Sequence, residues 1–409
     1  MAVGDTPFPE MPVIEGMRLG TGMAGIKKPD RRDLVVIEIA EGARVSGVFT
    51  RNAFCAAPVT VARERLVGRA AQGASARYLV INTGNANAGT GEPGLRDART
   101  TCAELARLAG VDEQSVLPFS TGVIGEPLPM ERLLAGLPAA LQALDDGPRA
   151  WQEAGEGILT TDTRAKGATV SVALGSQTVT INGIAKGSGM IRPDMATMLA
   201  FVATDAALEQ HLLDQLLRDA VERSFNCITV DSDTSTNDAC LLISTGRGAV
   251  VADESDLAIF RNGLQRVMTE LAQAVVRDGE GATKFVTLQV DEARSRREAL
   301  DVAFTVAHSP LVKTALYASD ANWGRILAAA GRAPVEDFEV NRVTIDLGEV
   351  RLVEQGGRAP GYTEEAGSAV MAREEIVIRI ALGRGEQSAT VWTSDLSHDY
   401  VTINADYRS

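Results

Sequence analysis

The sequence is poor in the residues that many enzymes use for metal binding, disulfide formation and acid–base catalysis. It contains four cysteines and three histidines in 409 residues, and no CxxC pair. The cysteines therefore predict neither a disulfide framework nor a zinc site. None of the three histidines lies in a sequence context typical of a serine or cysteine nucleophile, so acid–base chemistry is expected to use other groups.

Long apolar runs are also missing. The longest, residues 195–203, falls far short of the roughly 20 residues that a membrane-spanning helix needs. The N-terminus has neither a basic flank nor an apolar segment of the kind found in signal peptides. We therefore expect a cytoplasmic protein.

Basic residues are outnumbered by acidic ones, with 40 Lys and Arg against 54 Asp and Glu, so the formal net charge is −14. An overall negative field disfavours nucleic acid or an anionic membrane as a partner. An anionic substrate would have to be held by a local cluster of donors.

Strand and helix patterns alternate along the chain, which predicts a mixed α/β protein. Residues 33–40 and 44–50 are expected to form paired strands. Residues 77–82 resemble a buried strand, and Gly175–Ser176 resembles a hairpin turn. Helices are predicted at 93–110, 130–157, 206–224 and 255–278, and further strands at 228–230, 240–245, 375–382 and 389–395.

Three glycine-rich or acidic motifs only partly match known ligand-binding motifs. GTGMAG (20–25) precedes a strand instead of following one, unlike a dinucleotide-binding turn. DSDTSTND (231–238) lacks the glycine and the final glutamate of a calcium loop. NTGNANAGTG (82–91) has no lysine after it; it is either a tight polar turn or part of a substrate-lining wall.

The most informative segment is KGSGMIRPDMATMLAFVATDA (186–206). A glycine-rich entry leads to Ala196–Thr197 and then to an apolar stretch typical of a central strand. Threonine at the head of a buried strand suits an N-terminal nucleophile, whose own α-amine, with an unperturbed pKa near 7.7–8.0, can act as the general base. The same pattern also fits a strand-initiating core threonine.

Together with other segments, this stretch resembles the ornithine acetyltransferase family, also called glutamate N-acetyltransferase. The matching segments follow in the family's order from one end of the chain to the other. They are GVFTRN (47–52), INTGNANAGTG (81–91), PFSTGVIGEPLP (118–129), TTDT (160–163), FNCITVDSDTSTND (225–238), SPLVKTALYASDANWGR (309–325) and YVTINADYRS (400–409).

The resemblance implies self-cleavage between Ala196 and Thr197, giving an α chain (1–196) and a β chain (197–409) in one folded unit. Thr197 would then take an acetyl group from N2-acetyl-L-ornithine and pass it to L-glutamate in the cyclic arginine pathway, a ping-pong acyl transfer. The family's oxyanion hole falls on Thr121 and Gly122.

The family's substrate-binding positions fall on further residues of this chain. Lys186 matches the family's substrate-binding lysine, and Glu280 its acidic residue near the substrate amine. Either Thr160 or Thr161 would contact the substrate. Asn404 and Ser409 would fold back into the site from the C-terminus. The acidic stretch 231–238 receives no catalytic role.

The implied fold is a layered α-β-β-α sandwich of the type shared with self-processing aminopeptidases. The family needs no metal or cofactor, although bifunctional members also accept acetyl-CoA, and its two chains pair into heterotetramers. Three alternatives remain: a self-processing amidase or aminopeptidase, a catalytically inactive relative, and a transferase with a different acyl acceptor.

Overall fold

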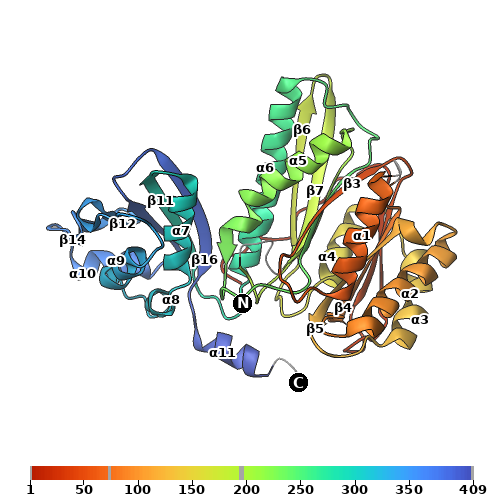
Figure 1. Cartoon of the computed structure of the whole chain (residues 1–409), viewed down its shortest axis with the longest axis horizontal. Helices are drawn as coiled ribbons and strands as arrows, with labels where there is room; N and C mark the ends of the chain where they lie inside the picture. Colours follow the sequence, from red (N-terminus) through yellow and green to blue (C-terminus); the bar gives the residue numbers. More distant parts are fainter. Residues whose placement is uncertain (1, 72–74, 193–197, 407–409) are drawn as a thin grey trace.

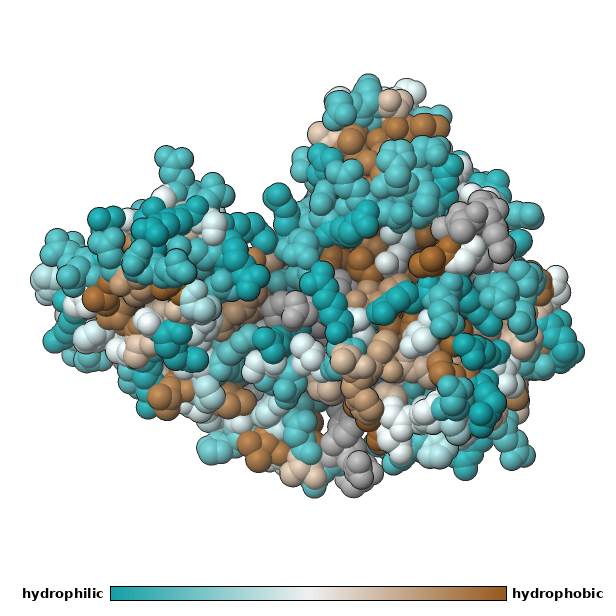
Figure 2. All heavy atoms as spheres, viewed as in Figure 1, coloured by the Kyte–Doolittle hydropathy of each residue, from teal (hydrophilic) through white to brown (hydrophobic). Residues whose placement is uncertain are grey.

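A computed structural model describes residues 2–71, 75–192 and 198–406. The chain forms two lobes, seen side by side in Figure 1, and a notch separates them on the face shown in Figure 2. The larger lobe contains two stacked sheets, and the smaller lobe is built on a third. Ala196, Thr197 and Ser409 lie outside the described residues.

Two sheets form the centre of the larger lobe. The first has the order β1-β2-β4-β5 and the second the order β3-β10-β8-β7-β6. The strands of the first sheet are β1 (Met17–Gly22), β2 (Leu34–Ile39), β4 (Tyr78–Asn85) and β5 (Val116–Val123). Those of the second are β3 (Arg44–Phe49), β6 (Lys166–Leu174), β7 (Gln177–Lys186), β8 (Leu199–Thr204) and β10 (Ala239–Ser244).

The space between these sheets is filled by apolar side chains from both. Phe119 of β5 meets Phe201 of β8 edge to face, with ring centroids 5.3 Å apart. In β2, Val35 and Ile37 belong to this inner core, whereas Leu34 and Val36 belong to the outer one. Because both faces of this part of the strand are buried, residues 34–37 form a continuous apolar run without alternation.

Helices cover the outer face of each sheet. α2 (Gly91–Ala109) and α3 (Met130–Gln142) pack on the first sheet, and α5 (Gln210–Glu222) and α6 (Glu254–Arg277) on the second. α1 (Ala57–Ala71) and α4 (Pro148–Gly157) complete the lobe. The expected α/β class and α-β-β-α layering are therefore confirmed.

The smaller lobe holds a seven-stranded sheet with its own apolar core. Its strands are β9 (Ile228–Thr229), β11 (Phe285–Ala293), β12 (Thr344–Leu347), β13 (Val350–Glu354), β14 (Gly357–Arg358), β15 (Glu375–Ala381) and β16 (Gln387–Ser394). Its helices are α7 (Arg296–Ala307), α8 (Pro310–Tyr317), α9 (Trp323–Gly331) and α10 (Glu364–Met371). α11 (His398–Ala405) leaves this lobe after β16 and lies below the junction of the two lobes in Figure 1.

One expectation about local structure is wrong. The strands at 33–40 and 44–50 do not pair, because β1 and β4 occupy both edges of β2 while β3 pairs with β10 in the other sheet. The helical region expected at 130–157 is confirmed and consists of two helices, α3 and α4. Asp145 interrupts it by exchanging backbone hydrogen bonds with Leu19 of β1, and Pro148 then starts α4.

The inner core predicts a test of the sandwich. Phe201→Ala should lower the free energy of unfolding by about 3–5 kcal/mol, because a cavity opens between the two sheets. Urea denaturation of the variant and the wild-type protein measures this difference. Leu311→Ala is the control, since Leu311 is exposed on the smaller lobe. If both variants lost the same free energy of unfolding, the packing of Phe201 between the sheets would not be a main source of stability.

Candidate active site

The Thr121–Gly122 pair stands at the end of β5, where the first sheet meets the second. Gly122 has a φ of +137°, and a Cβ there would lie 2.3 Å from the carbonyl carbon of Gly84 in the neighbouring strand. Only glycine fits this position. The close approach of β4 and β5 therefore fixes the backbone beside Thr121, as an oxyanion-binding site requires.

Lys186 ends β7 and lies almost completely buried. Its Nζ donates a hydrogen bond to Thr121 Oγ1 at 3.3 Å. Burial lowers the pKa of Lys186, and the ammonium of Lys166 adds to this effect, while the carboxyls of Asp162, Asp238 and Glu280 oppose it. The lysine thus brings a desolvated cation to the threonine of the expected oxyanion hole.

Glu280 lines the same pocket as this lysine and brings a carboxyl group to it. Glu280 is buried, and its backbone N–H donates to Ser188 O at 2.9 Å. Asn404 of α11 donates from Nδ2 to Glu280 Oε2 at 2.8 Å. A Cβ on Gly189 would lie 2.4 Å from the same carboxylate oxygen, so the glycine lets the backbone pass close to the carboxylate. The C-terminal helix thereby joins the site through Glu280.

These residues line one pocket. It brings together seven of the predicted site residues, which come from separate parts of the chain. They are Thr121, Gly122, Thr160, Thr161, Lys186, Glu280 and Asn404. Both Thr160 and Thr161 reach its wall, so both remain candidates for substrate contact. The predicted nucleophile Thr197, the cleavage partner Ala196 and the terminal Ser409 lie outside the described residues.

The chain on both sides of residues 193–197 is held by aspartates, the half-buried Asp231 and the buried Asp238. Asp231 accepts the backbone N–H groups of Met190 and Ile191 at 2.7 and 2.9 Å. On the other side, Asp238 Oδ1 accepts the N–H of Met198 at 2.9 Å. Burial raises the pKa of Asp238 well above its usual range. The strand that follows, β8, is the central strand of its sheet.

A buried ion cluster holds the backbone beside two residues of the pocket, Thr160 and Lys186. Lys166 Nζ lies 2.6 Å from both Asp162 Oδ1 and Asp278 Oδ2, and all three side chains are fully buried. Asp162 also accepts the N–H of Thr160 at 3.0 Å and that of Gly187 at 2.7 Å. Although burial opposes ionisation, the ammonium groups of Lys166 and Lys186 hold the pKa of Asp162 below its usual range.

Comparisons with known proteins show the family of this chain. The model of the ArgJ family matches residues 18–409. A relative in Pseudomonas syringae, the arginine biosynthesis bifunctional protein ArgJ, is 55% identical over the full length of both chains. The chain belongs to the ArgJ family.

Solved structures of the ArgJ family match this chain in part. The Bacillus halodurans arginine biosynthesis bifunctional protein ArgJ is 36% identical, covering 49% of this chain and 95% of its own, with a TM-score of 0.47. The Mycobacterium tuberculosis ornithine acetyltransferase, solved with ornithine, is 32% identical, covering 44% of this chain and 92% of its own, with a TM-score of 0.37.

Sequence reasoning missed the aspartates that hold the site of this ArgJ-family chain. Asp162 lies inside the TTDT motif, and Asp278 directly precedes the loop that carries Glu280. In the 231–238 stretch, Asp231 accepts backbone N–H groups, which is a structural role. The sequence signal for these aspartates is a carboxylate in a short polar motif beside an apolar strand, but this signal does not reveal which cation the carboxylate pairs with.

Among residues 2–71, 75–192 and 198–406, no group of His, Cys, Asp and Glu side chains could hold a metal ion, and no helix could span a membrane.

The ion cluster predicts a strong dependence on Lys166. Lys166→Met should lower the free energy of unfolding by about 3–5 kcal/mol, because two buried carboxylates lose their counterion. In the wild-type protein the lowered pKa of Asp162 contributes stability at neutral pH that is lost as the pH falls. In the variant, burial without the Lys166 ammonium should raise the pKa of Asp162 instead, so stability should increase on mild acidification.

Urea denaturation at several pH values between about 4 and 7 measures both effects. Arg149→Met is the matched control, because it removes an exposed cation from an i,i+4 ion pair with Glu153 and should change stability little. A variant whose pH dependence follows the wild type would show that the cluster does not control stability.

Proposed function

We infer that the protein transfers the acetyl group of N2-acetyl-L-ornithine to L-glutamate in arginine biosynthesis. The observation that carries this function is the convergence of Thr121, Gly122, Lys186 and Glu280 on one pocket, beside the strand that follows Thr197. The family membership supports the same conclusion. The substrates are small molecules, and the pocket offers groups of both charges for an amino acid.

The proposed reaction proceeds in two half-reactions. The Thr197 hydroxyl attacks the acetyl carbonyl of acetylornithine and its proton passes to the departing amine, so the amide C–N bond breaks and an acetyl ester forms. The α-amine of glutamate then attacks the ester, and its proton returns to the threonine oxygen. Backbone and hydroxyl donors at Thr121 and Gly122 would stabilise the oxyanion of each step.

Complementary charges in the pocket support the binding of an amino acid. Lys186 is a buried cation that can pair with a carboxylate, and Glu280 is a buried acidic residue that can pair with an ammonium group. Thr160 or Thr161 and Asn404 line the same pocket, and we propose that they complete the substrate contacts together with Ser409. The proposed chemistry needs no metal or bound cofactor.

We also propose that the chain cuts itself between Ala196 and Thr197 and stays assembled as chains 1–196 and 197–409. In support, β7 and β8, which flank the proposed cut, are neighbours in one sheet. Heterotetramer formation and a cytoplasmic location complete the proposal.

A second activity, with acetyl-CoA as acyl donor and glutamate as acceptor, is also proposed. The name of the Pseudomonas syringae relative includes the word bifunctional, which supports it. The thioester would acetylate the same Thr197: the C–S bond breaks, and the hydroxyl proton passes to the sulfur.

The transferase predicts that ornithine release depends on the acceptor. Incubation with acetylornithine alone should give one acetyl group per enzyme and then stop, whereas added glutamate should restore continuous release of ornithine. Chromatography of ornithine and N-acetylglutamate measures both products. Equally fast release without glutamate would identify a hydrolase of the amidase or aminopeptidase type instead.

The nucleophile assignment predicts the covalent state of the protein. Thr197→Ala should give one uncut, folded and inactive chain, because the variant has no hydroxyl to attack the Ala196 carbonyl. Intact mass under denaturing conditions should show two fragments for the wild type, the second beginning at Thr197. Thr197→Ser, which keeps the hydroxyl, is the matched control and should still cut slowly. Activity in the alanine variant would refute the mechanism.

A further inference from the structure

A second pocket adjoins the candidate active site on the side of the first sheet. It has a volume of about 300 Å³ and shares Gly122, Thr160 and Thr161 with the active-site pocket. Its remaining wall comes mainly from the loop between β1 and β2 and from the end of α11. A ligand whose acyl group lies at Thr121–Gly122 could therefore extend directly into this second pocket.

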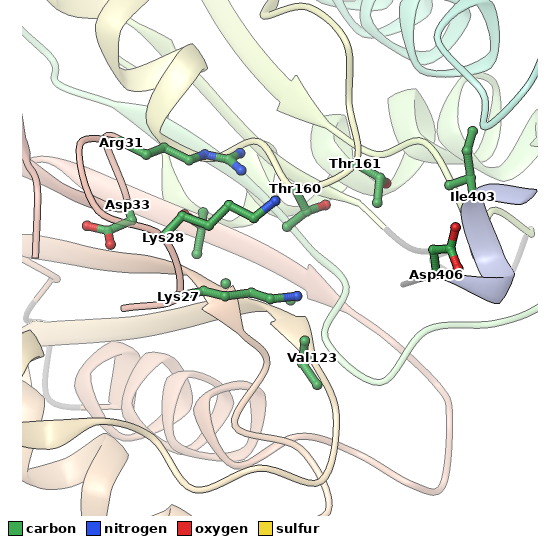
Figure 3. A pocket seen from close by; sticks show the side chains of 12 residues that line it. Lys27, Lys28, Arg31, Asp33, Val123, Thr160, Thr161, Ile403 and Asp406 are labelled. Atoms are coloured by element: carbon green, nitrogen blue, oxygen red, sulfur yellow. The ribbon is translucent and has the colours of Figure 1, made fainter. Parts of the chain in front are cut away.

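The second pocket is lined by three cations. Lys27, Lys28 and Arg31 all belong to the loop between β1 and β2. Figure 3 shows their side chains extending in the same direction, toward Thr160, with Ile403 and Asp406 across the pocket. We refer to these three residues as the basic loop.

The basic loop is fixed by buried contacts. Asp33 is 3% exposed, and its carboxylate accepts the backbone N–H groups of Ala24 and Ile26 at 2.6 Å each. Arg31 donates to Leu159 O at 2.5 Å, which ties the loop to the segment that carries Thr160. The carboxylate of Asp33 is thus engaged by the backbone, and the loop presents its lysines in a defined place.

The distribution of lysine marks this loop as special. The chain contains six lysines. Four of them are buried, namely Lys166, Lys186, Lys284 and Lys313. The other two, Lys27 and Lys28, are exposed, adjacent in sequence, and line this one pocket. Every other cationic side chain is an arginine, so both accessible lysines of a protein with a net charge of −14 lie beside the active site.

We propose that the basic loop binds the phosphate groups of acetyl-CoA when this thioester serves as acyl donor. The inference rests on the second activity proposed above and names its binding site. Lysine ammonium groups are compact, strongly charged partners for phosphate oxygens. Placing the phosphates at Lys27, Lys28 and Arg31 would leave the pantetheine arm to run past Thr160 toward Gly122.

The number of cationic donors favours phosphate over a carboxylate as the occupant. Three cations line the pocket; of its two lining carboxyl groups, Asp33 accepts backbone N–H groups and Asp406 lies across the pocket. A phosphate group offers three acceptor oxygens to several cationic donors, whereas the side-chain carboxylate of glutamate offers two. Lys186 and Glu280 already supply an opposite charge for each end of an amino acid in the neighbouring pocket.

The test compares two thioesters that differ in their phosphates. Acetyl-CoA carries them and acetyl-pantetheine does not. In a Lys27→Gln/Lys28→Gln variant, the ratio of kcat/KM for acetyl-CoA to that for acetyl-pantetheine should fall about tenfold or more, because charge-assisted hydrogen bonds are lost. The loss should appear mainly in KM. Raised ionic strength should weaken acetyl-CoA binding to the wild type more than to the variant.

Arg266→Gln/Arg297→Gln is the matched control. It removes the same amount of charge from two exposed arginines on α6 and α7, which form i,i+4 ion pairs with Glu270 and Asp301. Its thioester ratio should equal that of the wild type. Exchange of acetyl groups between acetylornithine and glutamate, measured on the same samples, distinguishes a damaged active site from a lost phosphate contact.

Chemical labelling gives a second readout without mutation. An acylating reagent should modify Lys27 and Lys28 in the free protein, and coenzyme A should protect both, as peptide mass spectrometry would show. Acetylornithine should give no such protection.

Each contrary result has a separate meaning. An unchanged thioester ratio without protection of the lysines would overturn the proposal. An increase confined to the KM of glutamate would assign the pocket to the acceptor carboxylate and overturn it as well. A wild-type protein that exchanges acetyl groups but never uses acetyl-CoA would remove the second activity and this site, yet leave the acetylornithine reaction intact.

Discussion

The buried ion cluster of Lys166, Asp162 and Asp278 is the contact on which the rest of the site depends. It joins the start of β6 to the loop that carries Thr160 and to the turn after α6. Through Asp162 it also fixes Gly187, the residue after Lys186. The chain is therefore held together around residues 162–166, 187 and 278, and the neighbouring residues Thr160, Lys186 and Glu280 line the pocket.

Such a cluster is costly unless every member is paired, because desolvation penalises each charge. Here the ammonium bridges two carboxylates, and both carboxylates also accept backbone N–H groups. The arrangement also sets the charge of the pocket. Lys186 is brought close to Lys166, which contributes to its lowered pKa, while Asp162 and Glu280 act in the opposite direction. Stability and electrostatics of the site thus have a common source.

The two lobes have different relations to this site. The sandwich supplies Thr121, Gly122 and Lys186 at strand ends. The smaller lobe reaches the site through α11, whose Asn404 contacts Glu280. Asp395, just before this helix, accepts the N–H groups of Thr283 and Lys284 at 2.8 and 2.9 Å. The contacts of Asp395 and Asn404 therefore hold both ends of the segment that contains α11 close to Glu280. In this way a lobe with a separate core contributes a residue to the pocket.

The sequence alone determined the α/β class, the hairpin of β6 and β7, most of the long helices and seven pocket residues, because these features depend on local periodicity or on motifs held in a fixed order. It did not determine which strands pair, since β2 and β3 are adjacent in sequence yet belong to different sheets. Nor did it reveal the ion cluster or the second pocket. Asp162 and Asp278 are separated by more than a hundred residues, and only tertiary packing brings one lysine between them. The same holds for Lys27 and Lys28, which appear in the sequence as two charges of a polar loop and acquire their position beside Gly122 only when β1, β2 and β5 form one sheet.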